Sequence, residues 1–286
     1  MDIWIARLVW IVMPFTLGRA IGDATATWSS DASLVAEVLA WTAWTVGASA
    51  LFAPRPWGLT ALRVLCANAL VIAITCAWWA DGVTSLLAIT SVAVVCAAAL
   101  GAVVTTASVA AENYGDERRY PLRVPLPLLL APVPFAAVVA GGGLVGPVLV
   151  FVNGNVVAGV LLALAGIPLA LGAIRGLHGL AARLLVFVPA GLVVIDPLTL
   201  ADPVLLLREN IVRVAPRDAV EPPAGALDLR VGTVFGSLLI GLSAPVSCAR
   251  RRGKRDVEVV ESTQILVAAV RSRAVAATAR ERLHTA

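Results

Sequence analysis

The sequence contains few of the residues on which most enzymes and soluble domains depend. Only 14% of its residues are charged, against about 25% in a typical soluble protein. It has two histidines and four cysteines, and no Cys-x-x-Cys or Cys/His spacing that would predict a metal centre. It also has no nucleophile elbow, zinc-protease, phosphate-loop or dinucleotide-binding fingerprint. We therefore predict no enzyme activity, no cofactor and no metal.

Lysine is almost absent, and positive charge is unevenly distributed. Lys254 is the only lysine, so the remaining basic side chains are arginine. Residues 1–174 carry a net charge of −1 and residues 175–286 a net charge of +5. The arginine bias, together with abundant alanine and valine, indicates a bacterial genome of high GC content. The second part of the chain is thus predicted to differ in kind from the first.

Long uncharged apolar runs dominate the first part. The chain is 59% hydrophobic and has a mean hydropathy of +0.91. About 20 apolar residues in a helix span the roughly 30 Å hydrocarbon core of a bilayer. Residues 1–176 are therefore predicted to form a bundle of about six transmembrane helices. The predicted spans are Ile3–Ile21, Leu34–Phe52, Leu59–Trp79, Val83–Ala107, Leu126–Val150 and Val156–Ile174, the fifth of them kinked or partly broken by proline and glycine.

The positions of the arginines predict the orientation of these spans. The turn after span two, the connector after span four and the segment after span six contain arginine, whereas the alternate loops contain almost none. Loops rich in Arg and Lys stay in the cytoplasm. We therefore expect a multi-pass protein of the bacterial cell (inner) membrane with both termini in the cytoplasm.

The residues from 182 onward follow a different pattern. Short apolar or alternating runs are punctuated by Asp196-Pro197 and Asp202-Pro203, which are turn signals. The end of the chain has apolar residues at i+4 spacing, typical of an amphipathic helix (Val275, Ala279 and Leu283). Residues 182–286 are therefore predicted to form a small cytoplasmic β-rich domain with a closing helix.

One segment of this region permits two interpretations. Val231–Cys248 is uncharged for 18 residues and precedes three arginines, so it could form a seventh span. Its proline, glycines and serines favour strands instead, and a seventh span would place the C-terminus outside. We predict strands and keep the seventh span as the alternative.

The last strand and helix carry a resemblance. The segment Thr263–Ala269, followed by Arg271–Leu283, resembles the end of bacterial pleckstrin-homology-like (PH-like) domains. The stretch Phe187–Pro197, with the later Asp202–Val204, is similar to a recurring stretch of uncharacterised multi-pass membrane proteins of high-GC Gram-positive bacteria. The resemblance implies a PH-like fold after membrane spans. It implies no activity and no functional residues.

A basic cluster in the tail is the strongest candidate for a binding site. Its members are Arg250, Arg251, Arg252, Lys254 and Arg255. Beside an anionic membrane, each basic side chain near the surface contributes about 1 kcal/mol of attraction. The cluster is a candidate site for anionic lipid headgroups or a protein partner, and its other interpretation is a solvated hairpin tip. No aromatic residues interleave with it, so we expect no nucleic-acid binding.

Polar residues inside the apolar runs form a second candidate site. They are Arg19 and Glu37, which could pair, and Asn68. Ionisable groups within a membrane often mark a transport path, although structural pairing and snorkelling explain them as well. Asn68 is expected to link helices. Glycines at i+4 spacing (Gly18/Gly22, Gly142/Gly146, Gly172/Gly176) favour close packing within the bundle, or a homodimer.

The sequence therefore favours a non-enzymatic scaffold or regulatory protein. Its cytoplasmic domain would bind a protein partner or anionic lipid of the bilayer in which the helices lie. The alternative is a small transporter or channel that uses Glu37 and the broken fifth span. Such transporters often contain matching repeats with broken helices, and no such repeat is visible here.

Overall fold

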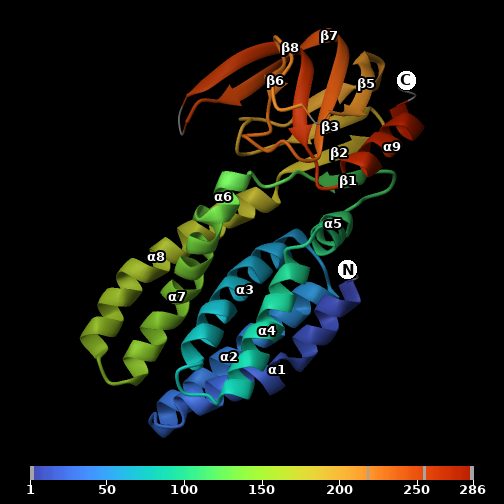
Figure 1. Ribbon diagram of the computed structural model, residues 1–286. Helices are drawn as coiled ribbons and strands as arrows, with labels where there is room; N and C mark the ends of the chain where they lie inside the picture. The colour runs from blue at the N-terminus through green and yellow to red at the C-terminus, as the bar shows by residue number, and fades with distance from the viewer. Residues whose placement is uncertain (1–2, 218, 254–255, 284–286) are drawn as a thin grey trace. The chain divides into compact units, whose positions relative to one another are not determined.

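The computed structural model of the chain describes residues 3–217, 219–253 and 256–283. Six helices are long and apolar enough to cross a membrane, as the sequence predicts (Figure 1). Their lengths, 18 to 26 residues, suit the thickness of a bilayer, which indicates a multi-pass membrane protein. The six helices are α1 (Ile3–Thr25), α2 (Ser30–Phe52), α3 (Pro56–Cys76), α4 (Gly82–Ala99), α7 (Pro132–Val152) and α8 (Val156–Ala181).

The chain divides into two compact units. The helical unit comprises the residues up to Ser108 together with Ala131–His178. The β unit comprises Val109–Leu130 and the residues from Gly179 onward. The β unit is therefore built from two separate stretches of chain, and the second stretch alone does not complete it.

Capping residues set where the helices begin. The Ser29 side chain accepts a hydrogen bond from Ala32 N, and helix α2 therefore starts before the predicted Leu34. The Asp81 carboxylate accepts bonds from the backbone N–H groups of Val83 and Thr84 at 2.9 and 3.0 Å, and caps α4. Such caps satisfy donors that have no partner inside the helix.

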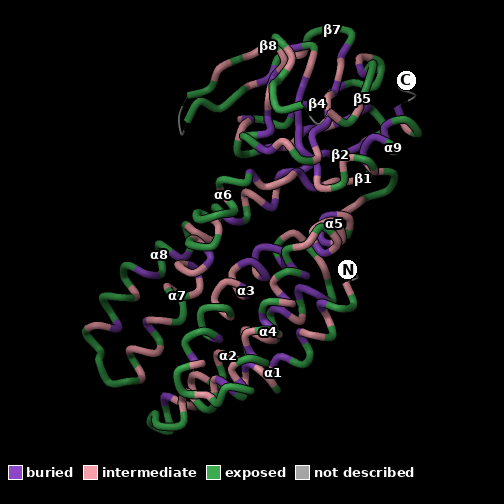
Figure 2. The backbone as a smooth tube through the Cα atoms, viewed as in Figure 1, coloured by how far each residue is buried: buried purple, intermediate pink, exposed green. Residues whose placement is uncertain are grey.

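Helices α1 and α2 are joined by a reciprocal pair of indoles. Trp10 Nε1 donates to Trp44 O, and Trp44 Nε1 donates to Trp10 O, both at 2.9 Å. Gly47 provides the space for this contact, because a Cβ there would lie 1.9 Å from Trp10 Cζ2. Many other large apolar residues of the unit are exposed, and Figure 2 colours much of the helical backbone as exposed or intermediate. Outward apolar faces are expected of helices whose solvent is lipid.

Helices α7 and α8 approach closely at glycine. A Cβ on Gly143 would lie 2.5 Å from Gly166 O, and a Cβ on Gly166 would lie 3.1 Å from Gly143 O. Gly141–Gly143 therefore do not interrupt α7. The predicted break of the fifth span lies earlier, between the short helix α6 (Leu126–Leu130) and Pro132, the first residue of α7.

The fourth span differs from the prediction. A single helix was expected over Val83–Ala107, but α4 ends at Ala99 and α5 (Ala102–Ala110) begins after a turn. The turn is closed by a bond from Gly101 N to Ala98 O at 3.1 Å. Because the residues on both sides are uniformly small and apolar, hydropathy does not register this interruption.

Among the described residues, the β unit contains two four-stranded sheets, the short helix α6 and a last helix. The first sheet has the order β1-β2-β3-β4, and all its pairings are antiparallel. The second has the order β5-β7-β8-β6, in which β6 is parallel to β8. The strands are β1 (Arg118–Pro121), β2 (Leu184–Val188), β3 (Gly191–Ile195), β4 (Val204–Leu207), β5 (Ile211–Pro216), β6 (Leu227–Asp228), β7 (Ser237–Arg251) and β8 (Val257–Ala268), with a 3₁₀ turn at Arg208–Asn210.

Both sheets and the last helix share one core. Helix α9 (Ser272–Leu283) buries Val275, Ala279 and Leu283, as their spacing predicts. They pack with side chains from both sheets, including Phe187 and Ile240.

The segment Val231–Cys248 contains no helix among the residues that the structure describes. From Ser237 it belongs to strand β7, which confirms the strand prediction over a seventh span. The register shifts between Gly241 and Val246, around Pro245. A proline cannot donate to the ladder, and the irregularity accommodates it.

The pairing of β1 with β2 has a topological consequence. Strand β1 precedes helices α7 and α8, and β2 follows them, yet Arg118–Pro121 pairs with Leu184–Phe187. The helical hairpin is thus inserted into a folded sheet. Whichever way the protein is oriented, both stretches of the β unit must lie on one side of the membrane.

Candidate functional site

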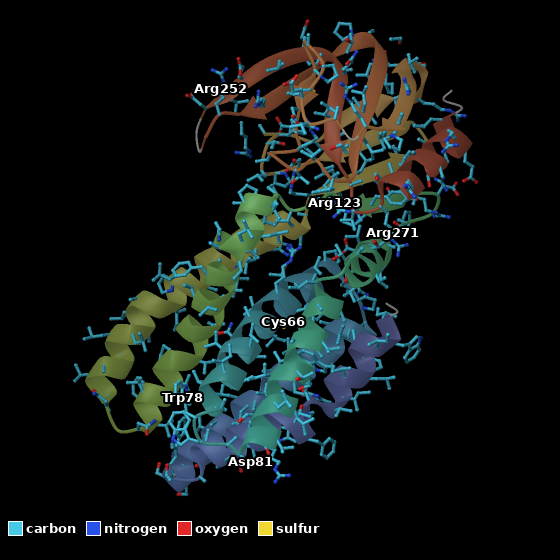
Figure 3. The ribbon with its side chains drawn as sticks, in the orientation of Figure 1. Cys66, Trp78, Asp81, Arg123, Arg252 and Arg271 are labelled. Atoms are coloured by element: carbon cyan, nitrogen blue, oxygen red, sulfur yellow. The ribbon has the colours of Figure 1, made fainter. Side chains whose placement is uncertain are left out.

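The outer part of the β7–β8 hairpin carries the basic cluster. We name its residues 246–253 and 256–262 the basic arm. Arg250, Arg251 and Arg252 are exposed on it, and Figure 3 shows Arg252 at its tip. The predicted site residues Lys254 and Arg255 lie outside the described residues.

The arm is fixed at its base by the core of the β unit. Cys248 is buried in the core, and Val246 and Val260 pack against it. The burial raises the pKa of the Cys248 thiol, so this thiol is an inert part of the packing.

Two of the three arginines also contact other residues of the β unit. Arg251 Nε donates to Leu200 O at 3.0 Å. Arg252 Nε lies 2.7 Å from Glu258 Oε2 in an exposed ion pair, and such pairs contribute only about 0–1 kcal/mol. The register places Glu258 opposite Arg250. The arginines remain accessible, and the arm combines them with the exposed side chains of Val257 and Val259.

The predicted intramembrane residues do not form one site. Asn68, on α3, donates through Nδ2 to Val64 O and to Ala137 O of α7, both at 2.8 Å. Gly141 makes room for this amide, because a Cβ there would lie 2.2 Å from Asn68 Nδ2. Asn68 therefore links two helices.

Arg19 and Glu37 lie apart from Asn68 and form no ion pair with each other among the described residues. Glu37 is exposed on α2. Arg19 and Asp81 both line a shallow pocket of about 210 Å³, near the C-terminal end of α1 and the N-terminal end of α4. The pKa of Asp81 is lowered, chiefly by the Thr84 hydroxyl that donates to it at 2.6 Å, and to a smaller extent by Arg19.

Thr60 and Arg63, near the N-terminal end of α3, form polar contacts with α8 that were not predicted as a site. Thr60 Oγ1 lies 3.2 Å from His178 Nδ1 of α8. Arg63 Nη1 donates to Leu177 O at 3.3 Å, and the arginine is buried. These contacts tie α8 to α3.

The most deeply buried ion pair of the β unit was also missed. Arg183 Nε and Nη2 bond both carboxylate oxygens of Asp196 at 2.7 Å, and both side chains are almost wholly inaccessible. Arg183 also donates to Arg123 O at 2.6 Å and Leu229 O at 3.3 Å. Asp196 accepts from Leu198 N as well, so the predicted turn role is real but secondary.

A second arginine organises the loop before β6. Arg230 is buried and holds the Asp228 carboxylate through Nε and Nη2 at 3.0 and 2.8 Å. It also donates to Ala219 O and Val220 O, both at 2.9 Å. Burial raises the pKa of Asp228, but the hydrogen bonds and charge of Arg230 outweigh it, and the net shift is downward.

Within the described residues, no three His, Cys, Asp or Glu side chains gather in a way that could hold a metal ion. No family model, curated protein or solved structure matches this chain. The exposed basic arm is the most distinctive candidate for binding.

Proposed function

We propose that this protein is a non-enzymatic, membrane-anchored adaptor whose β unit binds an acidic protein partner through the basic arm. One observation carries the proposal. Arg250, Arg251 and Arg252 are exposed on an arm of the sheet, and the strand pairing sets Arg251 on the same face as Val257 and Val259. Figure 3 shows Arg252 apart from Arg123, beside which the chain leaves for α7. Arginine beside exposed apolar side chains is the composition of protein-binding surfaces.

The orientation and location form part of the same proposal. The arginine-rich loops favour a cytoplasmic β unit in a bacterial cell membrane. Two small sheets closed by α9 support a PH-like fold for the β unit. The arginine-rich, lysine-poor composition supports an origin in high-GC Gram-positive bacteria.

Affinity capture of the full-length protein from native membranes tests the proposal. The test variant changes Arg250, Arg251 and Arg252 to Gln, which keeps hydrogen-bonding capacity and removes charge. The matched control changes Arg213, Arg273 and Arg280 to Gln, because these arginines are also exposed in the β unit. We expect the test variant to lose specific co-purifying proteins that the wild type and the control retain, with the wild-type interaction weakened by salt.

A lipid experiment separates the other source of negative charge. Wild-type protein in immobilised zwitterionic nanodiscs is offered fluorescent vesicles with or without anionic lipid. Under the proposal, retention is equally low for both. If anionic vesicles are retained through the three arginines while the captured proteins are unchanged in the test variant, the arm binds lipid and the adaptor proposal fails.

A further inference from the structure

The chain leaves the β unit for the apolar helices at two neighbouring points. Leu122 N donates to Arg183 O at 3.0 Å, and Arg183 Nη1 donates to Arg123 O at 2.6 Å. Helix α8 ends at Ala181, two residues before Arg183, so about 7 Å of extended chain is the largest separation there. We name the surface around Leu122, Arg123 and Arg183 the exit face.

Helix α8 is long enough to bring the exit face close to lipid. Its 26 residues rise about 39 Å, while the hydrocarbon core is about 30 Å thick. If α8 crosses the whole core, at most this excess of about 9 Å lies beyond the boundary at the exit end, and tilt of the helix reduces it. The exit face therefore remains within roughly 15 Å of the hydrocarbon boundary, whatever the tilt of the helices.

An apolar loop is attached to the exit face. This loop, Val231–Gly236, joins β6 to β7. Ala269 N donates to Gly236 O at 2.9 Å, and Arg123 Nε donates to Ala269 O at 3.3 Å. A Cβ on Gly236 would lie 2.7 Å from Arg123 Nε, and the φ of this glycine is +75°. Only glycine fits here without strain, so the loop and Arg123 are held in contact.

The loop presents apolar side chains outward. Phe235 is 77% exposed and Val231 is 42% exposed. Val231 is also the only non-glycine with positive φ (52°) among the described residues, a conformation that β-branched residues avoid. Buried Arg230, bound to Asp228, fixes the root of the loop. The exposed aromatic side chain is thus held by a rigid base.

The neighbouring chain has the same character. Helix α6, which follows Arg123 and leads into α7, exposes Leu126, Leu129 and Leu130. Arg271 is exposed next to Val270, whose carbonyl accepts a bond from Arg123 Nη2 at 3.3 Å. Exposed apolar residues bordered by arginine are typical of segments that lie in the headgroup region of a membrane.

We infer that the apolar loop inserts Phe235 into the lipid interface of the leaflet from which α7 and α8 emerge. The ligand is the boundary between headgroups and acyl chains. The loop acts as a third contact with the membrane, beside the two chain connections, and fixes the rotation of the β unit on the bilayer. This inference concerns a different surface from the basic arm and does not depend on a partner.

Lipid-based quenching of a fluorophore tests the inference in the full-length protein. Phe235→Cys is labelled with an environment-sensitive dye, and the protein is placed in nanodiscs that contain phosphatidylcholine and phosphatidylglycerol. The control is Val259→Cys on the basic arm, since Val259 is similarly exposed (70%). Protein with only its native cysteines gives the background, and Val231→Cys is a second position on the loop.

We expect the dye at 235 to emit at shorter wavelength and to lose most of its emission when lipids carry a quencher at shallow acyl depth. The dye at 259 should respond only to aqueous iodide. The inference is overturned if the dyes at 235 and 231 respond as the one at 259 does. It is also overturned if both loop dyes resist lipid and aqueous quenchers alike, because protein would then cover the loop.

Discussion

The buried side chain of Arg183 connects segments of the β unit that lie far apart in the sequence. Arg183 lies just before β2 and binds both carboxylate oxygens of Asp196 and two backbone carbonyls. This set of bonds requires the planar, five-donor guanidinium group of arginine. Removing one partner of such a pair leaves a buried charge without compensation. A single polar side chain thus connects both stretches of the β unit.

Arg183→Gln should destabilise the β unit by about 3–5 kcal/mol, the usual cost of breaking a buried ion pair. Hydrogen exchange of β2 and β3 in the full-length protein measures this. The control is Arg252→Gln, which removes an exposed pair and should cost at most about 1 kcal/mol. Equal effects of the two variants would show that Arg183 is less important than its burial indicates.

We expect the segment that Asp228 and Arg230 hold in place to be destabilised by acid. The folded pKa of Asp228 is lowered, so its contribution to stability is present above the unfolded pKa of about 3.9 and is lost as the pH falls through the folded pKa. Protonation frees Arg230 and the segment at Ala219 and Val220. Proteolysis there should accelerate below about pH 4, and Asp228→Asn should give fast cleavage already at neutral pH. A variant that is still protected at neutral pH would contradict this role.

At the scale of elements, the helices pack through a few close contacts. Gly47→Ala would force Trp10 away from α2, because the new Cβ would overlap its ring. Such overpacking costs about 1–3 kcal/mol, and the thermal midpoint in detergent should fall. Gly172→Ala is the matched control, since nothing lies within 4 Å of that position. A lower midpoint for the control, or an unchanged one for Gly47→Ala, would contradict the packing.

The spans could be predicted from sequence because long apolar runs need no partner to be recognised. Two features could not. Strand β1 is four residues long and pairs with a strand that follows the α7–α8 hairpin. No local sequence pattern therefore predicts it. Asp196 precedes proline and was explained by a turn, whereas its arginine lies 13 residues earlier. Both depend on long-range geometry that composition does not record.

The insertion of the hairpin predicts which fragment of the β unit folds. Residues 182–286 alone lack β1, Leu122 and Arg123, and should unfold without cooperativity. A chimera that joins 109–130 to 179–286 through a flexible linker should give a cooperative thermal transition. The reason is that β1 and β2 are antiparallel, and the strand ends nearest the linker, Pro121 and Leu184, pair with each other. Cooperative unfolding of 182–286 alone would show that the first stretch is dispensable.

At the scale of the whole molecule, one topological feature organises the protein. Two stretches of chain separated by a membrane-crossing hairpin fold into one unit, and they must share a side of the membrane. The proposed binding by the basic arm and the inferred insertion of the apolar loop both concern the unit that these two stretches form. The cytoplasmic assignment rests separately on the positions of the arginines.

Labelling single introduced cysteines in intact cells with a membrane-impermeant maleimide tests this statement most directly. Tyr114→Cys and Val259→Cys report the two stretches of the β unit, and Asn153→Cys reports the α7–α8 turn, all at exposed positions. We predict that Asn153→Cys reacts from outside, whereas Tyr114→Cys and Val259→Cys react only after permeabilisation. Labelling of Tyr114→Cys and Val259→Cys from opposite sides would contradict the account.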